Sequence, residues 1–259
     1  MADVALITGG TGLIGEHVLQ QWAVEGLRPV IVNRVDDDLL KAGTATALVE
    51  RLRPAVVLHL AWTASGTPGY RSDPNNEAWV EASLEFDAAC RTWGAWLLAT
   101  GTPLDSLAHP SDAYSRSKAR LRIELRSSVD AGLCTWLRPY YVVDPVRRRP
   151  ALVDQAVEAR DSGEPLALMT PDSEHDFVHA ADVGAAIIQV LRHQMRGEVS
   201  IGSGELRRVR DLVSALGAKW TPAAQVTNEP PQHQAAADIQ PLLDHGWLPS
   251  YTKEMFHDG

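Results

Sequence analysis

Two cysteines, Cys90 and Cys134, are all that the 259 residues contain, and no Cys-x-x-Cys spacing occurs. So few thiols exclude a disulfide-built scaffold, and we interpret both as buried side chains. No uninterrupted apolar run approaches the roughly 18 to 20 residues of a membrane span, and no leader segment precedes the first strand-like run. A net charge of -9 argues against general attraction to nucleic acid. These absences predict a globular cytoplasmic protein without membrane or nucleic-acid partners.

Three glycines near the N-terminus have a distinctive spacing. Gly9, Gly12 and Gly15 separate the apolar run Val4 to Thr8 from the amphipathic segment Leu13 to Val24, so we predict a buried strand, a tight turn and a helix. In such a turn the first glycine permits the bend, the second lets the backbone approach a pyrophosphate, and the third lets helix and strand pack closely. The helix N-terminus then faces the phosphates. The stretch predicts a nucleotide cofactor.

Strand-like and helical runs alternate through the first half of the chain. Strands are predicted at Val4 to Thr8, Val30 to Asn33, Ala55 to Ala61, Trp96 to Thr100 and Leu133 to Val143, and a helix at Ala42 to Arg53. Little room remains between the second strand and this helix, where we expect one short strand around Asp36 to Leu39. The alternation predicts an α/β fold, a Rossmann-like doubly wound parallel sheet.

The composition after residue 143 is broken by prolines and glycines, which predicts a small C-terminal substrate-binding lobe. We expect residues 1–140 to form the dinucleotide-binding domain and residues 141–259 to form mostly the lobe. A segment of about 176–202 is expected to return to the first domain. Ligands of open α/β sheets bind outside the carboxyl ends of the strands, so the lobe would close over the substrate there.

Tyr114 and Lys118 are four residues apart, which places both side chains on the same side of a helix. A neighbouring ammonium favours tyrosinate and lowers a phenol pKa from about 10 toward neutrality, as a general acid/base requires. The chain has five tyrosines and four lysines, so the spacing also arises by chance, and a surface pair is the alternative. The position after the predicted strand ending at Thr100 favours the catalytic interpretation.

Taken together, these motifs resemble the extended short-chain dehydrogenase/reductase superfamily, of the NAD-dependent epimerase/dehydratase type. The resemblance runs over nearly the whole chain, through Thr8 to Gly15, Leu58 to Ala61, Tyr114 to Lys118, Leu137 to Tyr140, Asp176 to Val183, Ile201 to Glu205 and Gly246 to Pro249. The compressed stretch Asn33 to Ala42 is most similar to the branch of nucleotide-sugar 4-ketoreductases.

The resemblance implies a catalytic trio of Tyr114, Lys118 and one hydroxyl from the end of the fourth strand. Thr102 is the first candidate for that hydroxyl and Thr100 the second, although Gly101 could also align at this position. In this scheme the tyrosine donates a proton to the substrate oxygen, the lysine binds the nicotinamide ribose and the threonine hydrogen-bonds the oxygen. Substrate contacts are expected from Thr102, Tyr114 and Tyr141.

Cofactor contacts are implied for a larger set: Gly9, Thr11, Gly12, Leu13, Ile14, Gly15, Asn33, Arg34, Asp38, Leu39, Leu60, Ala61, Trp62, Tyr114, Lys118 and Tyr140. Asn33 and Arg34 stand where an acidic residue would bind the adenosine ribose hydroxyls. Their presence favours NADP, with Arg34 pairing with the 2'-phosphate. An exposed Arg34 with no ligand is the alternative, and NAD stays possible.

The resemblance therefore implies an NADP(H)-dependent reductase of a nucleotide-linked keto-sugar, of the 4-keto-6-deoxyhexose type. Two alternatives stay open: an NAD-dependent nucleotide-sugar 4-epimerase, and a non-catalytic NAD(P)-binding sensor or scaffold. A homodimer through the Tyr114 helix and the preceding one would fit the family. We interpret His175 and His179 as structural, so no metal is expected. The run Arg147 to Arg149 is interpreted as solvated, with a substrate diphosphate clamp as the alternative.

Overall fold

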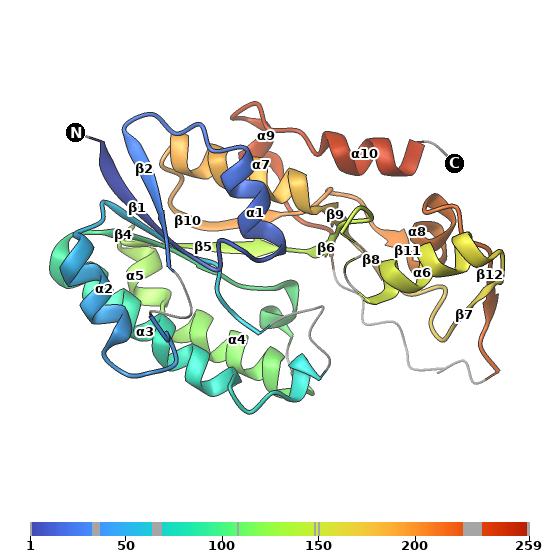
Figure 1. The fold of residues 1–259 in the computed structure, drawn as a ribbon, viewed down its shortest axis with the longest axis horizontal. Coiled ribbons are helices and arrows are strands. Elements are labelled where there is room, and N and C mark those ends of the chain that lie inside the picture. Colours follow the sequence, from blue (N-terminus) through green and yellow to red (C-terminus); the bar gives the residue numbers. More distant parts are fainter. Residues whose placement is uncertain are drawn as a thin grey trace.

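The computed structural model describes residues 2–32, 37–63, 69–107, 109–147, 149, 151–224 and 235–257. Its main feature is a six-stranded sheet in the order β2-β1-β3-β4-β5-β10, in which every neighbouring pair is parallel (Figure 1). The strands are β1 (Asp3–Thr8), β2 (Leu27–Ile31), β3 (Val56–His59), β4 (Trp96–Thr100), β5 (Cys134–Pro139) and β10 (Gly197–Ile201). The predicted α/β doubly wound fold is confirmed.

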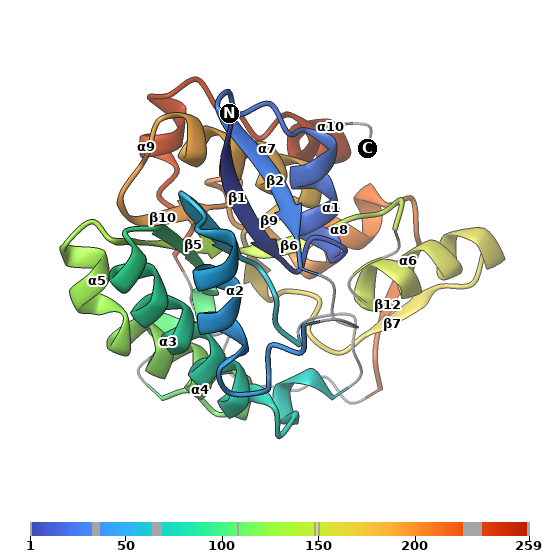
Figure 2. The same ribbon diagram turned by 60° about the vertical axis from the view of Figure 1, so that its left-hand side comes forward.

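Helices cover both faces of this sheet. One face carries α1 (Leu13–Gln20), α7 (Ala180–Arg192) and α9 (Gln240–Leu243), and the other carries α2 (Thr44–Leu52), α3 (Asn76–Trp93), α4 (Ala113–Glu124) and α5 (Arg126–Asp130) (Figures 1 and 2). Strand residues alternate between the two cores: Ala5 and Ile7 belong to the first core, whereas Leu6 belongs to the second. Continuous apolar strands buried on both faces are the reason that the sheet is parallel throughout.

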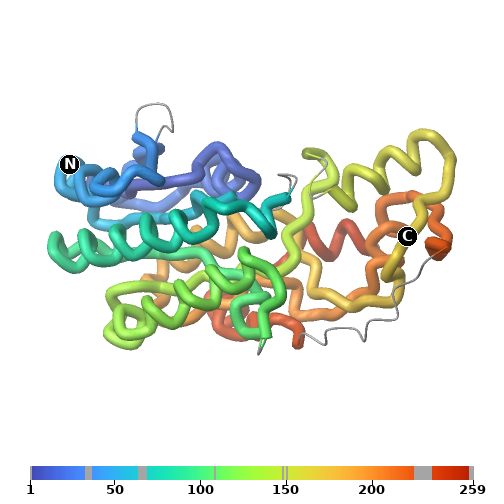
Figure 3. The backbone as a smooth tube through the Cα atoms, turned by 90° about the horizontal axis from the view of Figure 1, so that it is seen from below, coloured from blue at the N-terminus to red at the C-terminus, as the bar shows by residue number. Residues whose placement is uncertain are grey.

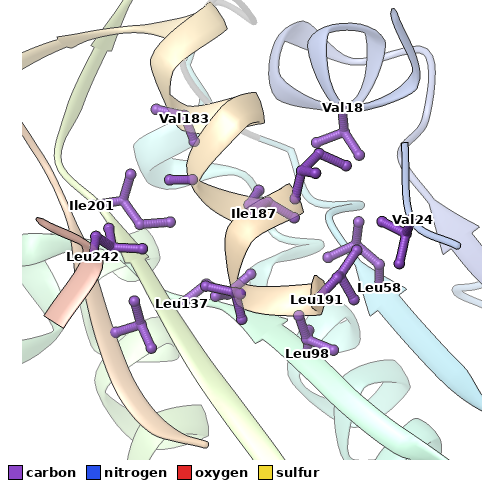
Figure 4. Close-up of a cluster of buried hydrophobic side chains, with 14 of the residues drawn as sticks. Val18, Val24, Leu58, Leu98, Leu137, Val183, Ile187, Leu191, Ile201 and Leu242 are labelled. Atoms are coloured by element: carbon purple, nitrogen blue, oxygen red, sulfur yellow. The ribbon is translucent and has the colours of Figure 1, made fainter. Parts of the chain in front are cut away.

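The core on the α1 and α7 side holds in place the glycine turn between β1 and α1. Val18 of α1 and Ile187 of α7 pack against Leu58, Leu98 and Leu137 from three consecutive strands of the sheet (Figure 4). All five side chains are at most 1% exposed. Burial of this kind contributes roughly 1.5–3 kcal/mol for each large aliphatic side chain, which fixes the position of α1 above the sheet.

The chain leaves the sheet after β5. The predicted strand Leu133 to Val143 is two strands, because the chain turns at Tyr140 and β6 (Tyr141–Val143) pairs with β9 (Phe177–His179) instead. A third core lies among the elements at the far end of the molecule (Figure 3), namely α6 (Ala151–Ser162), β7 (Leu166–Leu168), β8 (Glu174–His175), β11 (Arg207–Arg208), α8 (Val209–Ala215), β12 (Trp220–Pro222) and α10 (Ser250–His257).

Some predicted boundaries differ from the structure. The second strand lies at Leu27–Ile31 rather than Val30 to Asn33, and its Pro29 is tolerated because β2 is an edge strand. The short strand expected around Asp36 to Leu39 is wrong for the described part, 37–39. There the Asp38 carboxylate accepts a hydrogen bond from Leu40 N at 3.2 Å and makes a turn instead. No helix within the described ranges is long and apolar enough to cross a bilayer.

Candidate active site

The glycine turn between β1 and α1 has no room for side chains. Gly9 has φ +68°, and a Cβ there would lie 2.7 Å from Ala61 N at the end of β3. A Cβ on Gly15 would overlap the carbonyl oxygen of Gly9. Gly12 N donates to the same oxygen at 2.9 Å, which closes the turn. Gly9 and Gly15 are therefore required by the close approach of backbone to backbone, and a Cβ on Gly12 would lie 3.1 Å from the Gly9 carbonyl oxygen.

The N-terminus of α1 opens at this turn. Gly12 is the N-cap residue, and no side chain from the described residues caps the helix. Thr11 is exposed, while Leu13 and Ile14 are partly buried beside it. Backbone N–H groups without side-chain caps at a helix N-terminus, together with the helix dipole, attract phosphate. This cradle fits the pyrophosphate of a nicotinamide dinucleotide.

The predicted adenosine end of the cofactor site is only partly described. Asn33 and Arg34 lie outside the described residues. Asp38 is exposed, whereas Leu39 is buried in the second core with Leu6 and Leu48. The structure thus brings Leu39 into the protein interior and leaves Asp38 on the surface.

The end of β3 is braced by a buried histidine. His59 Nδ1 hydrogen-bonds Thr8 Oγ1 at 2.7 Å and its Nε2 hydrogen-bonds Ser83 Oγ at 3.0 Å. Ala61 N donates to Thr8 Oγ1 at 3.2 Å. Burial, and secondarily the charge of Lys118, lowers the pKa of His59 to about 3. A neutral imidazole therefore fixes the backbone of Leu60, Ala61 and Trp62, which were predicted to face the cofactor.

Tyr114 and Lys118 lie one turn apart on α4, which Asp112 caps through a hydrogen bond from Ser115 N to its Oδ1 at 2.8 Å. Tyr114 is 9% exposed and Lys118 is 2% exposed. The Lys118 ammonium donates to the carbonyl oxygen of Thr100 at 2.8 Å and lies 3.4 Å from the centroid of the Trp62 ring. A hydrogen bond and a cation–π contact together hold this lysine against the end of β4.

The two candidate threonines have different surroundings. Thr102 lies close enough to the Tyr114 phenol to lower its pKa, and it is buried at the start of the 3-10 helix η2 (Pro103–Ser106). The Thr100 hydroxyl instead donates to the carbonyl oxygen of His59 at 3.1 Å, within the sheet. The structure brings Thr102 together with Tyr114 and Lys118 and leaves Thr100 to the sheet.

Electrostatics in the site differ from the sequence-based expectation. Burial raises the pKa of the Tyr114 phenol well above its ordinary value; the neighbouring Tyr70 and Asp105 act in the same direction, and Thr102 opposes them. Burial lowers the pKa of Lys118 to about 7, against which Asp105 acts. Lys118 was expected to lower the phenol pKa, but its ammonium lies 6.0 Å from the Tyr114 ring centroid and burial outweighs it. Tyr114 thus keeps its proton near neutral pH.

Two residues that the sequence analysis missed cover Tyr114. The Tyr70 ring lies edge-on to Tyr114, with centroids 5.2 Å apart. Arg71 donates to Asp112 Oδ2 at 2.9 Å and also hydrogen-bonds Tyr70. Both belong to a 3-10 turn, η1 (Tyr70–Ser72), which no hydrophobic periodicity in the sequence predicts. The preceding Gly69 at φ +74° was the available turn signal.

The aromatic residues predicted at the edge of the lobe separate from one another. Tyr140 follows β5, and its backbone N–H donates to Ile201 O at 2.9 Å. Tyr141 is on β6, where its ring lies 4.1 Å from the His175 ring by centroids, and beyond it is Phe177. The structure therefore places Tyr141 among aromatic side chains at the edge of the third core.

Of the other polar residues singled out from the sequence, His179 and Arg147 have structural partners, whereas the buried Nδ1 of His175 has no hydrogen-bond partner among the described residues. His179 caps α7 by accepting a hydrogen bond from Ala181 N at 3.1 Å. Arg147 forms ion pairs with Glu16 and Asp144, so it is not simply solvated, while Arg148 lies outside the described residues. Among the described residues no group of three or more His, Cys, Asp or Glu side chains could hold a metal.

The arrangement can supply a proton to an oxygen that gains negative charge. A protonated phenol, a second hydroxyl and an ammonium converge at the carboxyl ends of β3 and β4, beside the glycine turn. Groups fixed in this way stabilise charge as it forms without having to reorganise.

Comparison with known proteins places these features in one family. The model of the NAD dependent epimerase/dehydratase family matches residues 5–202. A UDP-glucose 4-epimerase from Azospirillum brasilense is 26% identical over 310 aligned residues, which cover 96% of this chain and 88% of that protein.

Solved structures share the fold over the whole chain. A UDP-glucose 4-epimerase of Thermus thermophilus in complex with NAD has a TM-score of 0.74 and 23% identity, covering 95% of this chain and 94% of its own. A dTDP-4-dehydrorhamnose reductase from Bacillus anthracis in complex with NADP has a TM-score of 0.78 and 14% identity, covering 99% and 97%. At these identities the likeness supports the fold.

Proposed function

Because the chain belongs to the NAD-dependent epimerase/dehydratase family, we propose that it is an NADP(H)-dependent reductase of a nucleotide-linked keto-sugar. Family membership makes it an NAD(P)-dependent enzyme of the extended short-chain dehydrogenase/reductase type. The finer proposal concerns the direction of the reaction and the substrate, a 4-keto-6-deoxyhexose attached to a nucleoside diphosphate.

One observation carries this proposal: the buried side chains of Tyr114 and Lys118 lie one turn apart on α4, and Lys118 is held at the end of β4, two residues before Thr102. A keto-sugar carbonyl that becomes an alkoxide needs a proton donor, and a phenol that keeps its proton at neutral pH is one. An epimerase must begin with the opposite step, removal of a proton from a sugar hydroxyl. The phenol form of Tyr114 is the form that reduction uses, and the balance of cofactor against product distinguishes the two reactions.

Each residue of the site has a role in this proposal. When bound, the dinucleotide supplies the hydride that the carbonyl carbon accepts. Gly9, Gly12 and Gly15 hold the pyrophosphate against the N-terminus of α1. Thr102 donates a hydrogen bond to the substrate oxygen and Tyr114 gives it a proton. The ammonium of Lys118 binds the nicotinamide ribose and balances the charge left on the tyrosine.

The substrate class is proposed from the relatives. Those named above are a UDP-glucose 4-epimerase and a dTDP-4-dehydrorhamnose reductase, so a nucleoside diphosphate sugar is common to both. We place its sugar at Tyr114 and Thr102, with Tyr141 at the edge of the lobe. Residues 1–140 would hold the dinucleotide, and the lobe of residues 141–259 would close over the nucleotide.

The cofactor preference and the assembly are further parts of the proposal. Asn33 and Arg34 favour NADP, since an acidic residue that would repel a 2'-phosphate is missing from that position. We also propose that α3 and α4 pair two copies of the chain, in the cytoplasm.

The balance of cofactor against product tests the reductase. We expect one NADPH to be oxidised for each molecule of a nucleoside diphosphate 4-keto-6-deoxyhexose reduced, measured by absorbance at 340 nm together with chromatography of the sugar nucleotide. No oxidation of NADPH with any of a panel of dTDP-, UDP- and GDP-linked keto-sugars would contradict the proposal.

A second candidate, a nucleotide-sugar 4-epimerase, is favoured by the 26% identity to the Azospirillum enzyme. It would use the same tyrosine and lysine without net consumption of cofactor. Purified protein that retains NAD through gel filtration, and that interconverts UDP-glucose and UDP-galactose without added NADPH, would replace the reductase by this candidate.

A further inference from the structure

Behind the candidate site lies a carboxylate that the proposed reaction does not use. Asp105, in η2, has a side chain with no exposed surface. Its Oδ2 accepts hydrogen bonds from Thr102 N at 3.0 Å and from Trp136 Nε1 at 3.1 Å, and its Oδ1 accepts from Ser106 Oγ at 3.0 Å and Arg138 Nε at 3.2 Å. The carboxylate is therefore fully hydrogen-bonded and buried.

The surrounding sequence is shaped to admit this group. Thr102 and Asp105 form a capping box, with Pro103 in the first turn of η2. A Cβ at Gly101 would lie 2.5 Å from Asp105 Oδ2 and 2.5 Å from the Trp136 ring. Glycine at position 101, where the family alignment could place the catalytic hydroxyl, is thus a consequence of the carboxylate.

The charges around Asp105 are arranged on two sides. On the side of β5 and β10, Arg138 bridges Asp105 and Glu198, and Arg122 of α4 pairs with Glu198 and lies 3.9 Å from Asp105. On the other side Asp105 acts on Lys118 and Tyr114. A buried ion pair of this kind contributes little to stability compared with apolar packing, so its position next to the site calls for another role.

We propose that Asp105 is a positioning residue of the Tyr114–Lys118 site, which fixes the main chain that carries Thr102 and places a buried negative charge directly behind the site. This inference rests on the proposed function for its catalytic consequence. Its structural content, the coupling between Asp105 and Lys118, can be measured without turnover.

The remaining groups near Lys118 and Tyr114 are few. His59 faces Lys118 from β3 and is neutral, because burial lowers its pKa to about 3. Tyr70 and Arg71 face Tyr114 from η1. From α3, Glu77 binds Ser117 and Arg120 on the outer side of α4, and Glu81 binds Arg120 as well. Asp105 is the carboxylate that acts on Lys118 and opposes the effect of burial.

Removal of the Asp105 charge should shift the pKa of Lys118 in a defined direction. In Asp105→Asn the ammonium of Lys118 loses a stabilising anion, so it deprotonates at lower pH. In Arg138→Gln the carboxylate loses a counter-cation, so Lys118 deprotonates at higher pH. Opposite shifts from two neighbouring substitutions distinguish an electrostatic role from a loss of structure.

The four lysines of the chain make the titration readable. With ¹³C-labelled lysine ε-carbons, the Lys118 resonance of the wild-type protein should titrate near its pKa of about 7, and its assignment follows from Lys118→Arg. We expect the midpoint in Asp105→Asn to fall by about one pH unit and in Arg138→Gln to rise. Glu81→Gln, which neutralises an exposed carboxylate bound to α4 through Arg120, should leave it unchanged.

Turnover supplies the second readout. At pH 7.5 Asp105→Asn should lower kcat about 10-fold with KM for NADPH little changed, and the basic limb of the pH profile should move in the same direction as the resonance. An unmoved Lys118 midpoint in both variants would overturn the inference. If Asp105→Asn fails to fold, the inference is tested by Arg138→Gln alone, in which the Lys118 midpoint should rise. If the Lys118 midpoint shifts in these variants but the wild-type protein reduces no keto-sugar, the proposed function is rejected and the coupling between Asp105 and Lys118 is still supported.

Discussion

At the scale of single residues, the Thr102 hydroxyl belongs to the candidate site, whereas the Thr100 hydroxyl belongs to the sheet. Thr102 acts on the pKa of Tyr114. The Thr100 hydroxyl instead donates to His59 O, and the Thr100 carbonyl oxygen accepts a hydrogen bond from Lys118. Two threonines only two positions apart therefore serve different neighbours. The motif alone left both open, because the distinction depends on where β4 ends and η2 begins.

Substitution of these two threonines by valine should give opposite results. Thr102→Val removes a hydrogen bond to the charge that forms on the substrate oxygen, so kcat should fall about 10²-fold. Thr100→Val loses one sheet hydrogen bond, so the free energy of unfolding should fall by about 1 kcal/mol while kcat is retained. Steady-state kinetics and urea unfolding of both variants check this. A larger kcat loss in Thr100→Val than in Thr102→Val would exchange the two assignments.

At the scale of secondary structure elements, the glycine turn is the part of the fold that the sequence predicted most clearly. β1, the turn and α1 were predictable because each glycine has one steric reason, and the structure supplies all three. The end of α1 was not predictable: the apolar pattern continues to Val24, but the helix ends at Gln20. Likewise Leu133 to Val143 reads as one strand, because nothing in an apolar run shows that its second half will pair with β9.

The turn makes a prediction about cofactor binding. Gly15→Ala places a methyl group against the Gly9 carbonyl and 2.7 Å from Gly10 Cα, so the turn must open. Overpacking of this kind costs about 1–3 kcal/mol, which corresponds to roughly 10- to 100-fold weaker binding of NADPH. Fluorescence titration measures it.

Gly26→Ala is the matched control. Gly26 differs from Gly15 in having a positive φ of +76°, and a Cβ there meets nothing within 4 Å. The strain lowers stability and leaves the affinity for NADPH unchanged. Equal loss of affinity in both variants would mean that the turn at Gly15 has no special part in cofactor binding.

At the scale of the whole molecule, the sequence predicted the sheet and its helices better than it predicted the site's electrostatics. The Tyr114–Lys118 spacing is local, and so it was visible in the sequence. The groups next to these two side chains, Trp62, Tyr70 and Asp105, belong to other elements. Short polar turns such as η1 and η2 carry these contacts, and their tertiary partners have no periodic signature.

Burial of ionisable groups makes the stability of the molecule depend on pH. The pKa of His59 is lowered to about 3 from 6.5, so the unfolded chain binds more protons between these values, and stability should fall as pH falls below about 6.5. The pKa of Lys118 is lowered to about 7 from 10.5, so its contribution to stability should rise as pH increases through that window. Above about pH 9 the buried thiols of Cys90 and Cys134 act in the opposite direction, because burial raises their pKa values. Urea unfolding at a series of pH values measures both slopes.

The variant Lys118→Met isolates the contribution of Lys118 to the pH dependence of stability. This variant should lose the rise between about pH 7 and 10.5 and keep the decline toward acid pH. Equal slopes of stability against pH in the wild-type protein and in Lys118→Met between about pH 7 and 9 would contradict the buried, cation-disfavouring environment of Lys118.

The central claim is that the Tyr114 phenol gives its proton to a carbonyl beside the bound nicotinamide, and the measurement that tests it most directly is single-turnover reduction by Tyr114→Phe. Loss of the phenolic proton should slow the chemical step about 10²- to 10⁴-fold, with the dissociation constant for NADPH nearly unchanged because the glycine turn is intact. A rate for Tyr114→Phe equal to that of the wild-type protein would contradict the account.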